Sequence, residues 1–364
     1  MTIDLADGID EQLAAVPNCS GIFLIHTEGR DPYLARTALL RRRLLRLLAE
    51  RTQPSRLLSL RSIARRVDYW PTASRLETAI LFYRLARQWF PQSYLEVTKL
   101  RMPSYVKLVL SNAFPRTHVT TRLSGGNFFF GPFRTRSNAD DFQTACLDLF
   151  QLRRCQEDLE PSPNHPGCIY GEMNMCLRPC QEVVGPQEYR SEVRRVKEFL
   201  STGGHSLLEP ALGARDQLSA ELRFEEAARE HTRVDKIEAA LKLRDPLAAS
   251  VQDLCGVAIT PCLDAACVEL WFVTAGCFQP PVRFRVAPVE GEMVPLDRRL
   301  REAYAALPPA EEVEDRQEHL ALLARWFYSS WRDGEWLSFE QGQPPYRKLV
   351  RVLSRVAASA QRTS

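Results

Sequence analysis

The spacing of apolar residues switches between strand-like and helix-like several times along this chain. Residues 17–35 hold a short apolar run, a polar turn and a second apolar run, a pattern that predicts a β-hairpin. Residues 36–50 repeat leucine every three or four positions, which predicts an amphipathic helix. Residues 74–90 predict a second helix, because Ser74 stands at its N-cap and Glu77 at the capping-box position.

The same two spacings continue to the C-terminal end. Residues 105–130 alternate as three short strands, residues 138–154 predict a helix, and a further helix begins near residue 186. Residues 212–241 predict a hairpin of two helices, and residues 257–286 predict three strands followed by a charged helical tail. Strands and helices grouped in this way are typical of an α+β multidomain protein.

Composition limits the class of protein. The chain has 364 residues, of which 45% are hydrophobic and 26% charged, so we expect several globular domains. It contains no run of eighteen apolar residues, and its N-terminus lacks a basic start followed by an apolar run. We therefore expect a cytoplasmic protein with no membrane partner.

Positive charge is concentrated near the N-terminus, although the net charge is only +3. Residues 36–66 hold ten arginines and one acidic residue, Glu50. The arginines are Arg36, Arg41, Arg42, Arg43, Arg46, Arg51, Arg56, Arg61, Arg65 and Arg66. A solvated basic face on an ordinary helix is one interpretation, and a surface that binds the phosphates of a nucleic acid is the other.

Four cysteines, Cys155, Cys168, Cys176 and Cys180, lie in a polar, proline-rich stretch between two predicted helices. This stretch has too few apolar residues to order itself, whereas a bound metal could order it. Disulfides and unrelated core thiols are the alternatives, but no secretory signal supports the first and the polar loop offers little core for the second. Uneven spacing suits an iron-sulfur cluster, of the 4Fe-4S type, better than zinc, which usually takes two close pairs.

A second group, Cys255, Cys262, Cys267 and Cys277, lies in apolar, strand-like sequence. Judged by residue type alone, these four cysteines could be ligands of a second metal. Their setting favours buried core thiols instead.

Several motifs together resemble the bacterial UvrC family of excinuclease subunits, which includes the short homologue Cho. PNCSGIF followed by PYLA is similar to a degenerate GIY-YIG nuclease signature, FFFGPF to the turn after that domain, and CLRPC to the family's cysteine segment. Residues 212–241 resemble a UVR motif, and the order of all four is that of UvrC. The resemblance covers residues 17–295.

This resemblance implies five domains. They are a small GIY-YIG-like α/β domain (1–100), a strand-rich connector (101–136), a Cys-rich, cluster-binding helical region (137–200), a UVR-like helical hairpin (201–245) and a truncated C-terminal region with a helical tail (246–364).

The resemblance also maps catalytic residues. A tyrosine that assists the attacking water corresponds to Tyr33, an arginine that stabilises the phosphate to Arg43, and a lysine to Arg36. The first-strand tyrosine is replaced by Phe23 and the following glycine by Ala35. The family resemblance thus leaves only part of a nuclease site.

The position of the family's metal-binding glutamate is occupied by Phe82, nine residues before Pro91. An aromatic ring cannot coordinate a hard cation, so we predict loss of phosphodiester cleavage, with Mg²⁺ required only if the nuclease is active. A shifted alignment with Glu77 as ligand is the alternative, although five helical positions turn it about 140° around the axis from Phe82. The C-terminal strands show no set of three or four embedded acidic residues for two-metal hydrolysis.

The UVR-like hairpin implies binding to UvrB, or to a second copy of this chain. The predicted contact residues are Leu222, Phe224, Glu225 and Ala228, and an ordinary intramolecular hairpin is the alternative.

The sequence therefore predicts a UvrC-like DNA-binding protein of nucleotide excision repair that acts as a scaffold or regulator. We expect DNA as its partner and no small-molecule substrate. The DNA-binding candidates are Arg36, Arg41, Arg42, Arg43 and Arg46. An active endonuclease like Cho, making a single incision beside a lesion, is the second hypothesis, and a redox sensor that regulates a nuclease is the third.

Overall fold

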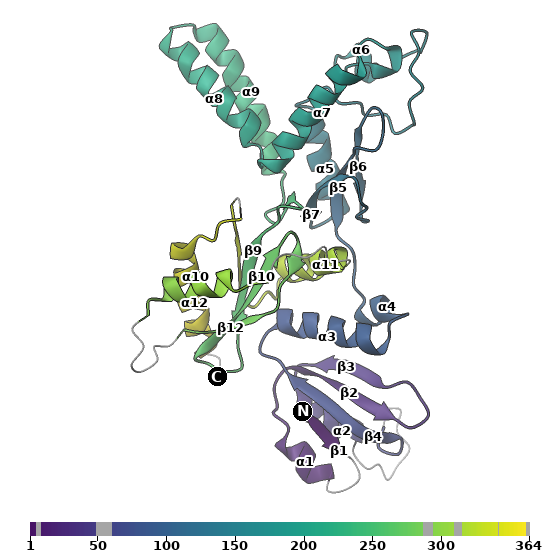
Figure 1. Ribbon diagram of the computed structural model, residues 1–364, viewed down its shortest axis with the longest axis vertical. Helices are drawn as coiled ribbons and strands as arrows, with labels where there is room; N and C mark the ends of the chain where they lie inside the picture. Colours follow the sequence, from purple (N-terminus) through teal and green to yellow (C-terminus); the bar gives the residue numbers. More distant parts are fainter. Residues whose placement is uncertain (5–8, 49–59, 287–293, 309–314, 341, 362–364) are drawn as a thin grey trace.

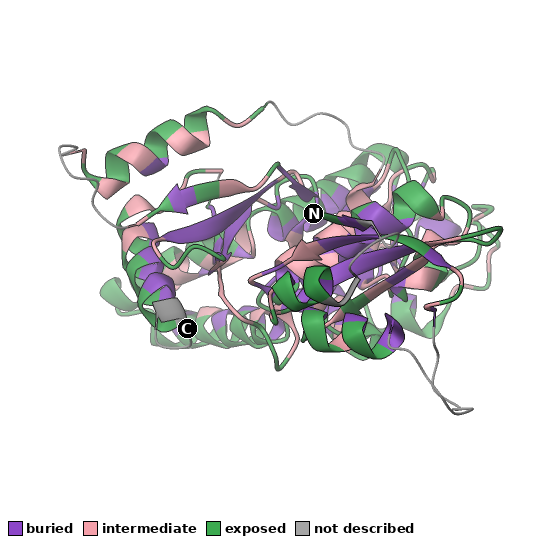
Figure 2. Ribbon diagram, turned by 90° about the horizontal axis from the view of Figure 1, so that it is seen from below, coloured by how far each residue is buried: buried purple, intermediate pink, exposed green. Residues whose placement is uncertain are grey.

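The computed structural model describes residues 1–4, 9–48, 60–286, 294–308, 315–340 and 342–361. In these residues thirteen strands form three antiparallel sheets and twelve α-helices pack around them, which confirms the α+β multidomain class (Figure 1). Figure 2 shows that the buried residues are concentrated in the strands, while the helices carry most of the exposed ones. No helix among the described residues is long and apolar enough to span a membrane.

The N-terminal sheet has the order β1-β4-β2-β3. Its strands are β1 (Thr2–Asp4), β2 (Gly21–Thr27), β3 (Tyr33–Thr37) and β4 (Ala64–Pro71), and β2 and β3 form the predicted hairpin. Helices α1 (Ile9–Ala15) and α2 (Leu40–Leu48) cover one face, and α3 (Arg75–Trp89) covers the other (Figure 1). The helix predicted from residue 36 begins only at Leu40, because residues 36 and 37 pair with β2.

Helix α3 begins as the capping-box pattern predicts. The backbone N–H of Glu77 donates to Ser74 Oγ (3.1 Å), and Glu77 Oε2 accepts from the N–H of Ala73 (2.7 Å). Its second face packs against the C-terminal region, so this helix lies between two parts of the protein (Figure 1).

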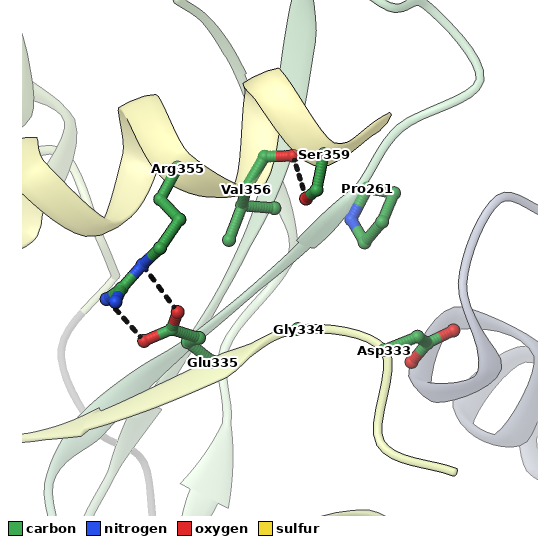
Figure 3. Close-up of a pocket in the computed structure, with 7 residues that line it drawn as sticks. All are labelled: Pro261, Asp333, Gly334, Glu335, Arg355, Val356 and Ser359. Carbon is green, nitrogen blue, oxygen red and sulfur yellow. Dashed lines mark hydrogen bonds and ion pairs between the residues drawn. The ribbon is translucent and has the colours of Figure 1, made fainter. Parts of the chain in front are cut away.

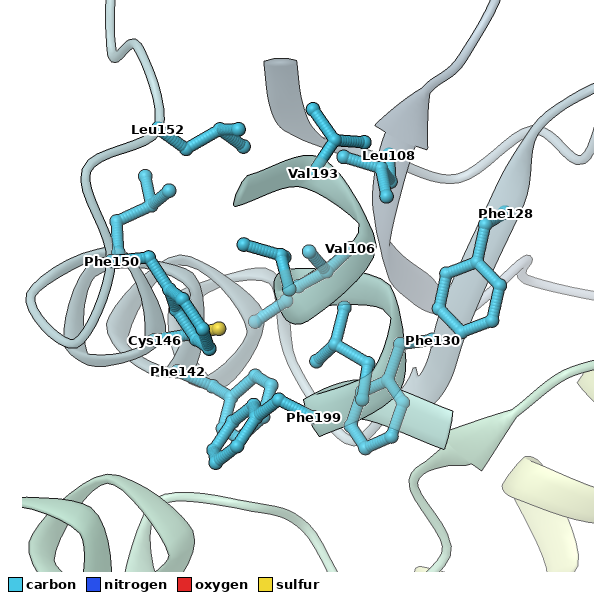
Figure 4. Packing of buried hydrophobic residues seen from close by; sticks show 14 of the residues in the cluster. Val106, Leu108, Phe128, Phe130, Phe142, Cys146, Phe150, Leu152, Val193 and Phe199 are labelled. Carbon is cyan, nitrogen blue, oxygen red and sulfur yellow. The ribbon is translucent and has the colours of Figure 1, made fainter. Parts of the chain in front are cut away.

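The middle sheet has the order β6-β5-β7-β8. Its strands are β5 (Ser104–Val109), β6 (Arg116–Thr120), β7 (Phe128–Phe133) and β8 (Ala249–Ser250), and its helices are α5 (Arg136–Leu147), α6 (Ile169–Glu172) and α7 (Pro186–Ser201). The short helix α4 (Tyr94–Thr98) lies beside α3 instead (Figure 1). Aromatic side chains fill the core between the sheet, α5 and α7 (Figure 4). The helix predicted to reach residue 154 ends at Leu147, and Cys155 follows a segment without regular structure.

Helices α8 (His205–Ala220) and α9 (Phe224–Lys242) form the predicted hairpin, which projects from the body of the molecule (Figure 1). The C-terminal sheet has the order β11-β10-β9-β13, with β12 also paired to β10. Its elements are β9 (Gly256–Pro261), β10 (Cys267–Thr274), β11 (Cys277–Phe278), β12 (Val282–Arg285), β13 (Glu335–Ser338), α10 (Leu296–Ala305), α11 (Arg316–Phe327) and α12 (Tyr346–Gln361).

The C-terminal sheet corrects one sequence prediction. Residues 335–338, expected as part of a helical tail, form β13 and pair with β9. Cys262, Cys267 and Cys277 are buried and Cys255 is half-buried, in agreement with the prediction of core thiols.

Candidate cluster site and nucleic-acid-facing surfaces

The loop that carries the four predicted metal ligands is fastened to the middle domain by backbone hydrogen bonds. The N–H of Leu177 donates to the carbonyl of Gln151 (3.0 Å), and the N–H of Ser162 donates to the carbonyl of Cys180 (2.9 Å). Cys168 precedes the short helix α6, whereas Cys180 lies in a 3₁₀ turn, Pro179–Gln181. The polar loop is thereby folded back on the segment that leads to Cys155.

The four thiols lie within electrostatic range of one another. Burial raises the pKa of Cys176 to about 11, and charge on Cys155, Cys168 and Cys180 raises it as well. Burial also raises the pKa of Cys180, with contributions from Cys168 and Cys155. Four thiolates in this loop would therefore repel one another unless a cation neutralised them.

A single-ion site and an iron-sulfur cluster differ in how closely they bring their thiolate ligands together. A single zinc ion holds its thiolates about 2.3 Å away, and hence within roughly 4 Å of each other. Among the described residues, no three His, Cys, Asp or Glu side chains form a group that could hold one metal ion. The ligands of an iron-sulfur cluster are bound to different iron atoms and lie farther apart.

Two hydrogen-bond donors point at sulfur. The N–H of Arg178 donates to Cys176 Sγ (3.4 Å), and Arg153 Nη1 lies 3.3 Å from Cys155 Sγ. The hydrogen bond from Arg178 opposes the burial that raises the pKa of Cys176.

The arginine-rich segment is divided by the structure. Arg41, Arg42, Arg43 and Arg46 share α2, but Arg36 lies on β3, on the opposite face of the sheet. Arg51 and Arg56 lie outside the described residues.

Arg65 and Arg66 both have acidic partners that lie outside residues 36–66. Arg65 forms an ion pair with Glu28, and Arg66 pairs with Asp68 at 2.8 Å. The positive charge of residues 36–66 is therefore partly balanced by acidic residues outside the segment. Helix α2 remains the candidate surface for binding nucleic acid.

The predicted catalytic residues fall on both faces of the N-terminal sheet. Tyr33 packs beside Phe23 on the α2 side, with ring centroids 6.1 Å apart, and Arg43 lies on α2 itself. Phe82 is 7% exposed and packs on the other face with Ile22, Leu24 and Leu34. The Arg36 guanidinium lies over the Phe82 ring, 5.4 Å from its centroid.

Burial and the nearby Arg325 lower the pKa of Arg36. The structure therefore brings Arg36 to Phe82, the position of the family's metal ligand, and surrounds that position with apolar side chains.

Glu77, the alternative metal ligand, faces the C-terminal region. Burial raises its pKa, the hydrogen bonds from Ala73 and Ser74 oppose that effect, and Arg283 and Asp333 are the charges nearest to it. One of its oxygens is already engaged as a helix cap. Its surroundings are thus a contact between domains, away from Tyr33.

The tip of the helical hairpin exposes apolar side chains. Leu222 is 72% exposed and Phe224 is 64% exposed, and Leu222 has a positive φ of 61°. Glu225 and Ala228 are exposed beside them on α9. The predicted partner-binding residues therefore face outward and do not pack within the hairpin.

Sequence reasoning missed a polar group on the α3 face of the N-terminal sheet. His26 Nε2 lies 2.8 Å from Asp68 Oδ2, and the His26 ring meets Trp89 edge-on at 5.2 Å. Burial alone would raise the pKa of Asp68, but hydrogen bonds from Arg66, Thr2 and His26 hold it at about 2. No sequence motif marks this group, because its members come from three strands and a helix.

A cavity of about 310 Å³ lies between α12 and the start of β13 (Figure 3). Arg355 and Glu335 at its wall form a paired contact, with Arg355 Nε 2.8 Å from Glu335 Oε1. The two charges neutralise each other, and this cavity is separate from the cysteines and from α2.

Comparison with known proteins identifies the class of this architecture. Residues 104–199, which carry the middle sheet, the four cysteines and α7, match the family model for the UvrC/Cho excinuclease middle domain. The chain is therefore a UvrC-like protein.

Its relatives extend the likeness beyond the middle domain. The UvrABC system protein C of Moorella thermoacetica is 25% identical over 325 residues, which cover 87% of this chain and 53% of the relative. The protein of the same name from Rickettsia africae is 27% identical over 283 residues, covering 76% of this chain and 43% of the relative. The chain thus spans about half the length of the curated relatives it matches, and no solved structure matches it.

Proposed function

We propose that this protein is a UvrC-like component of nucleotide excision repair that binds DNA and repair partners without cutting DNA. The observation that carries the proposal is Phe82, a buried aromatic residue where the resemblance requires a carboxylate. Without that carboxylate, no ligand at this position neutralises the charge that develops on the phosphate oxygens during hydrolysis.

An incision assay tests the loss of cleavage. Purified protein is incubated with nicked or lesion-bearing duplex DNA and either Mg²⁺ or Mn²⁺, and the expected result is no product. Incision that disappears in the Tyr33→Phe variant would overturn the proposal and favour the second hypothesis, a single-incision endonuclease. The capping hydrogen bond of Glu77 and its position beside Arg283 and Asp333 speak against that hypothesis.

DNA binding is assigned to the basic face of α2. The affinity of a protein for nucleic acid falls as the salt concentration rises, with a slope proportional to the number of phosphates that the protein neutralises. Replacement of Arg42 and Arg46 by Ala should therefore weaken binding to any DNA sequence and reduce the salt slope by roughly two phosphates. Arg298→Ala, on α10, is a matched control that changes charge far from α2. Equal losses in both variants would show that α2 is not the binding surface.

The loop cysteines are assigned to an iron-sulfur cluster, with zinc as the alternative. Support comes from the influence of Cys155, Cys168 and Cys180 on the pKa of Cys176 and from hydrogen-bond donors aimed at two of the sulfurs. The cluster would supply a multivalent cation that cross-links the loop. Anaerobic purification followed by metal analysis and visible absorbance tests this assignment, and zinc in place of iron would refute it.

The hairpin tip is assigned to a UvrB-like partner. Exposed Leu222 and Phe224 offer an apolar contact flanked by acidic residues, and burial of such side chains commonly dominates binding energy. The Leu222→Asp variant should lose capture of UvrB from the same organism, whereas Leu243→Asp, at an exposed leucine beyond the far end of α9, should retain it. Capture that survives Leu222→Asp would contradict the assignment.

A further inference from the structure

Arg153 is a charged side chain in the interior of the middle domain. It is 1% exposed, among the largest fully buried side chains of the protein. Its guanidinium donates to three carbonyl oxygens, of Phe114 (2.8 Å), Glu157 (2.8 Å) and Cys155 (3.4 Å). These acceptors are neutral, so they satisfy hydrogen bonds without balancing the charge.

The guanidinium has no carboxylate partner within ion-pair distance in the part of the chain that the structure describes. Its Nη2 atom is buried and has no hydrogen-bond partner. Arginine cannot escape the cost of burial by losing its proton. A buried, unpaired charge costs several kcal/mol in general, so an anion is expected beside it.

The next residue in the chain shows what a balanced arginine looks like. Arg154 Nη2 lies 2.7 Å from Asp148 Oδ1, and its guanidinium also stacks on Tyr170, 5.3 Å from the ring centroid. Two adjacent arginines thus differ in that Arg154 has a carboxylate and Arg153 has a sulfur.

The contact of Arg153 that can become an anion is the Cys155 thiol, 3.3 Å from Nη1. Cys155 also belongs to the four thiols that influence one another electrostatically. A thiol that binds a metal is deprotonated, so four ligating cysteines carry four negative charges, which a positive iron-sulfur core balances only in part; the loop keeps a net negative charge. This negative charge would lie beside Arg153 and would supply the anionic partner that Arg153 lacks.

We propose that Arg153 is the buried counter-cation of the four-cysteine site and holds the Cys155 side chain in position. This inference rests on the proposed iron-sulfur cluster. Arg153 acts through Cys155 and is therefore a positioning residue. Its backbone N–H donates to the Tyr189 hydroxyl (3.0 Å), which in turn donates to the carbonyl of Pro115 (2.8 Å), so the residue is fixed from a second side.

The proposal predicts different effects of one substitution in the iron-free and the iron-loaded protein. In the iron-free protein Arg153→Met removes an uncompensated buried cation but also three hydrogen bonds to carbonyl groups, so the net change in unfolding temperature should be small. In the iron-loaded protein the same substitution leaves thiolates without their counter-charge. Iron should then be bound roughly 10- to 100-fold more weakly, the usual effect of losing a group that supports a metal ligand.

The experiment compares full-length wild type, Arg153→Met, Arg153→Lys and Arg154→Met, each purified anaerobically. Iron per chain, the rate of iron release to a chelator, and the unfolding temperature with and without iron are measured. We expect fast release from Arg153→Met, near wild-type retention in Arg153→Lys because the charge is kept, and wild-type retention in Arg154→Met.

The outcomes separate this inference from the proposal on which it rests. Wild type without iron refutes the cluster itself. Wild type with iron, together with equal release rates in wild type and Arg153→Met, refutes the role of Arg153 alone. A fall in unfolding temperature of the same size in both states, or equal iron loss from Arg153→Met and Arg153→Lys, would show that Arg153 only bonds to carbonyl groups or fills space.

Discussion

Glu269 provides the sharpest test of how the domains of this protein are joined. It lies on β10, is 8% exposed, and faces the α3 side of the C-terminal sheet. Burial raises its pKa to about 7, the charge of Glu77 on α3 raises it too, and Arg283 opposes them. The carboxyl group is thus most stable in its neutral form where two domains meet.

The size of the effect follows from the linkage between protonation and folding. The ordinary pKa of this side chain is 4.5, so between pH 4.5 and about 7 the folded protein holds a proton that the unfolded chain has lost. Stability must then fall as the pH rises through this window, and the loss is complete above pH 7. A rise from 4.5 to about 7, at about 1.4 kcal/mol per pH unit, gives a loss of up to about 3 kcal/mol.

Glu269→Gln removes this cost. Urea unfolding should show the variant more stable than wild type at pH 8, by up to about 3 kcal/mol, and equal to it at pH 4. Glu77→Gln keeps an oxygen for the helix cap but removes a charge that raises the pKa of Glu269, so it should lower the pH at which the loss of stability is complete. A Glu269→Gln variant that is less stable than wild type at pH 8 would refute the reasoning.

Three further perturbations test the N-terminal domain. Phe82→Ala should lower the free energy of unfolding by about 3 to 5 kcal/mol, as expected for a buried phenylalanine, and a loss under 1 kcal/mol in urea unfolding would contradict its burial. Asp68→Asn should lower the free energy of unfolding by roughly 1 to 2 kcal/mol at pH 7, because the lowered pKa of Asp68 stabilises the fold above pH 3.8. In wild type this contribution disappears as the pH falls towards 2. A variant whose acid unfolding is the same as that of wild type would argue against the pairing of Asp68 with His26 and Arg66. Gly21→Ala places a Cβ 2.5 Å from the carbonyl oxygen of Trp70 and should destabilise the sheet by about 1 to 3 kcal/mol, whereas an unchanged melting temperature would mean that β2 and β4 are not so close.

Local sequence patterns predicted the elements whose stability is local. Ser74 and Glu77 form the N-cap of α3 as expected, since both partners lie within four residues of each other. The β2–β3 hairpin and the strands β5, β6 and β7 follow from alternation and turn residues, which need no distant partner to be recognised.

Predictions that depended on distant partners were less accurate. The segment 335–338 has a helix-like context but forms β13, because its backbone completes the edge of β9. The count of acidic residues in segment 36–66 left Arg65 without a partner, yet Glu28, 37 positions away in sequence, forms an ion pair with it.

The sequence by itself determined the composition of the cysteine loop and the presence of an aromatic residue at position 82, because residue identity and spacing are properties of the chain alone. Only the tertiary structure decided that Arg153 lies without a carboxylate partner beside Cys155, and that Glu269 meets Glu77. The physical reason is that burial and electrostatic pairing depend on distances between segments far apart in sequence, and folding alone sets those distances.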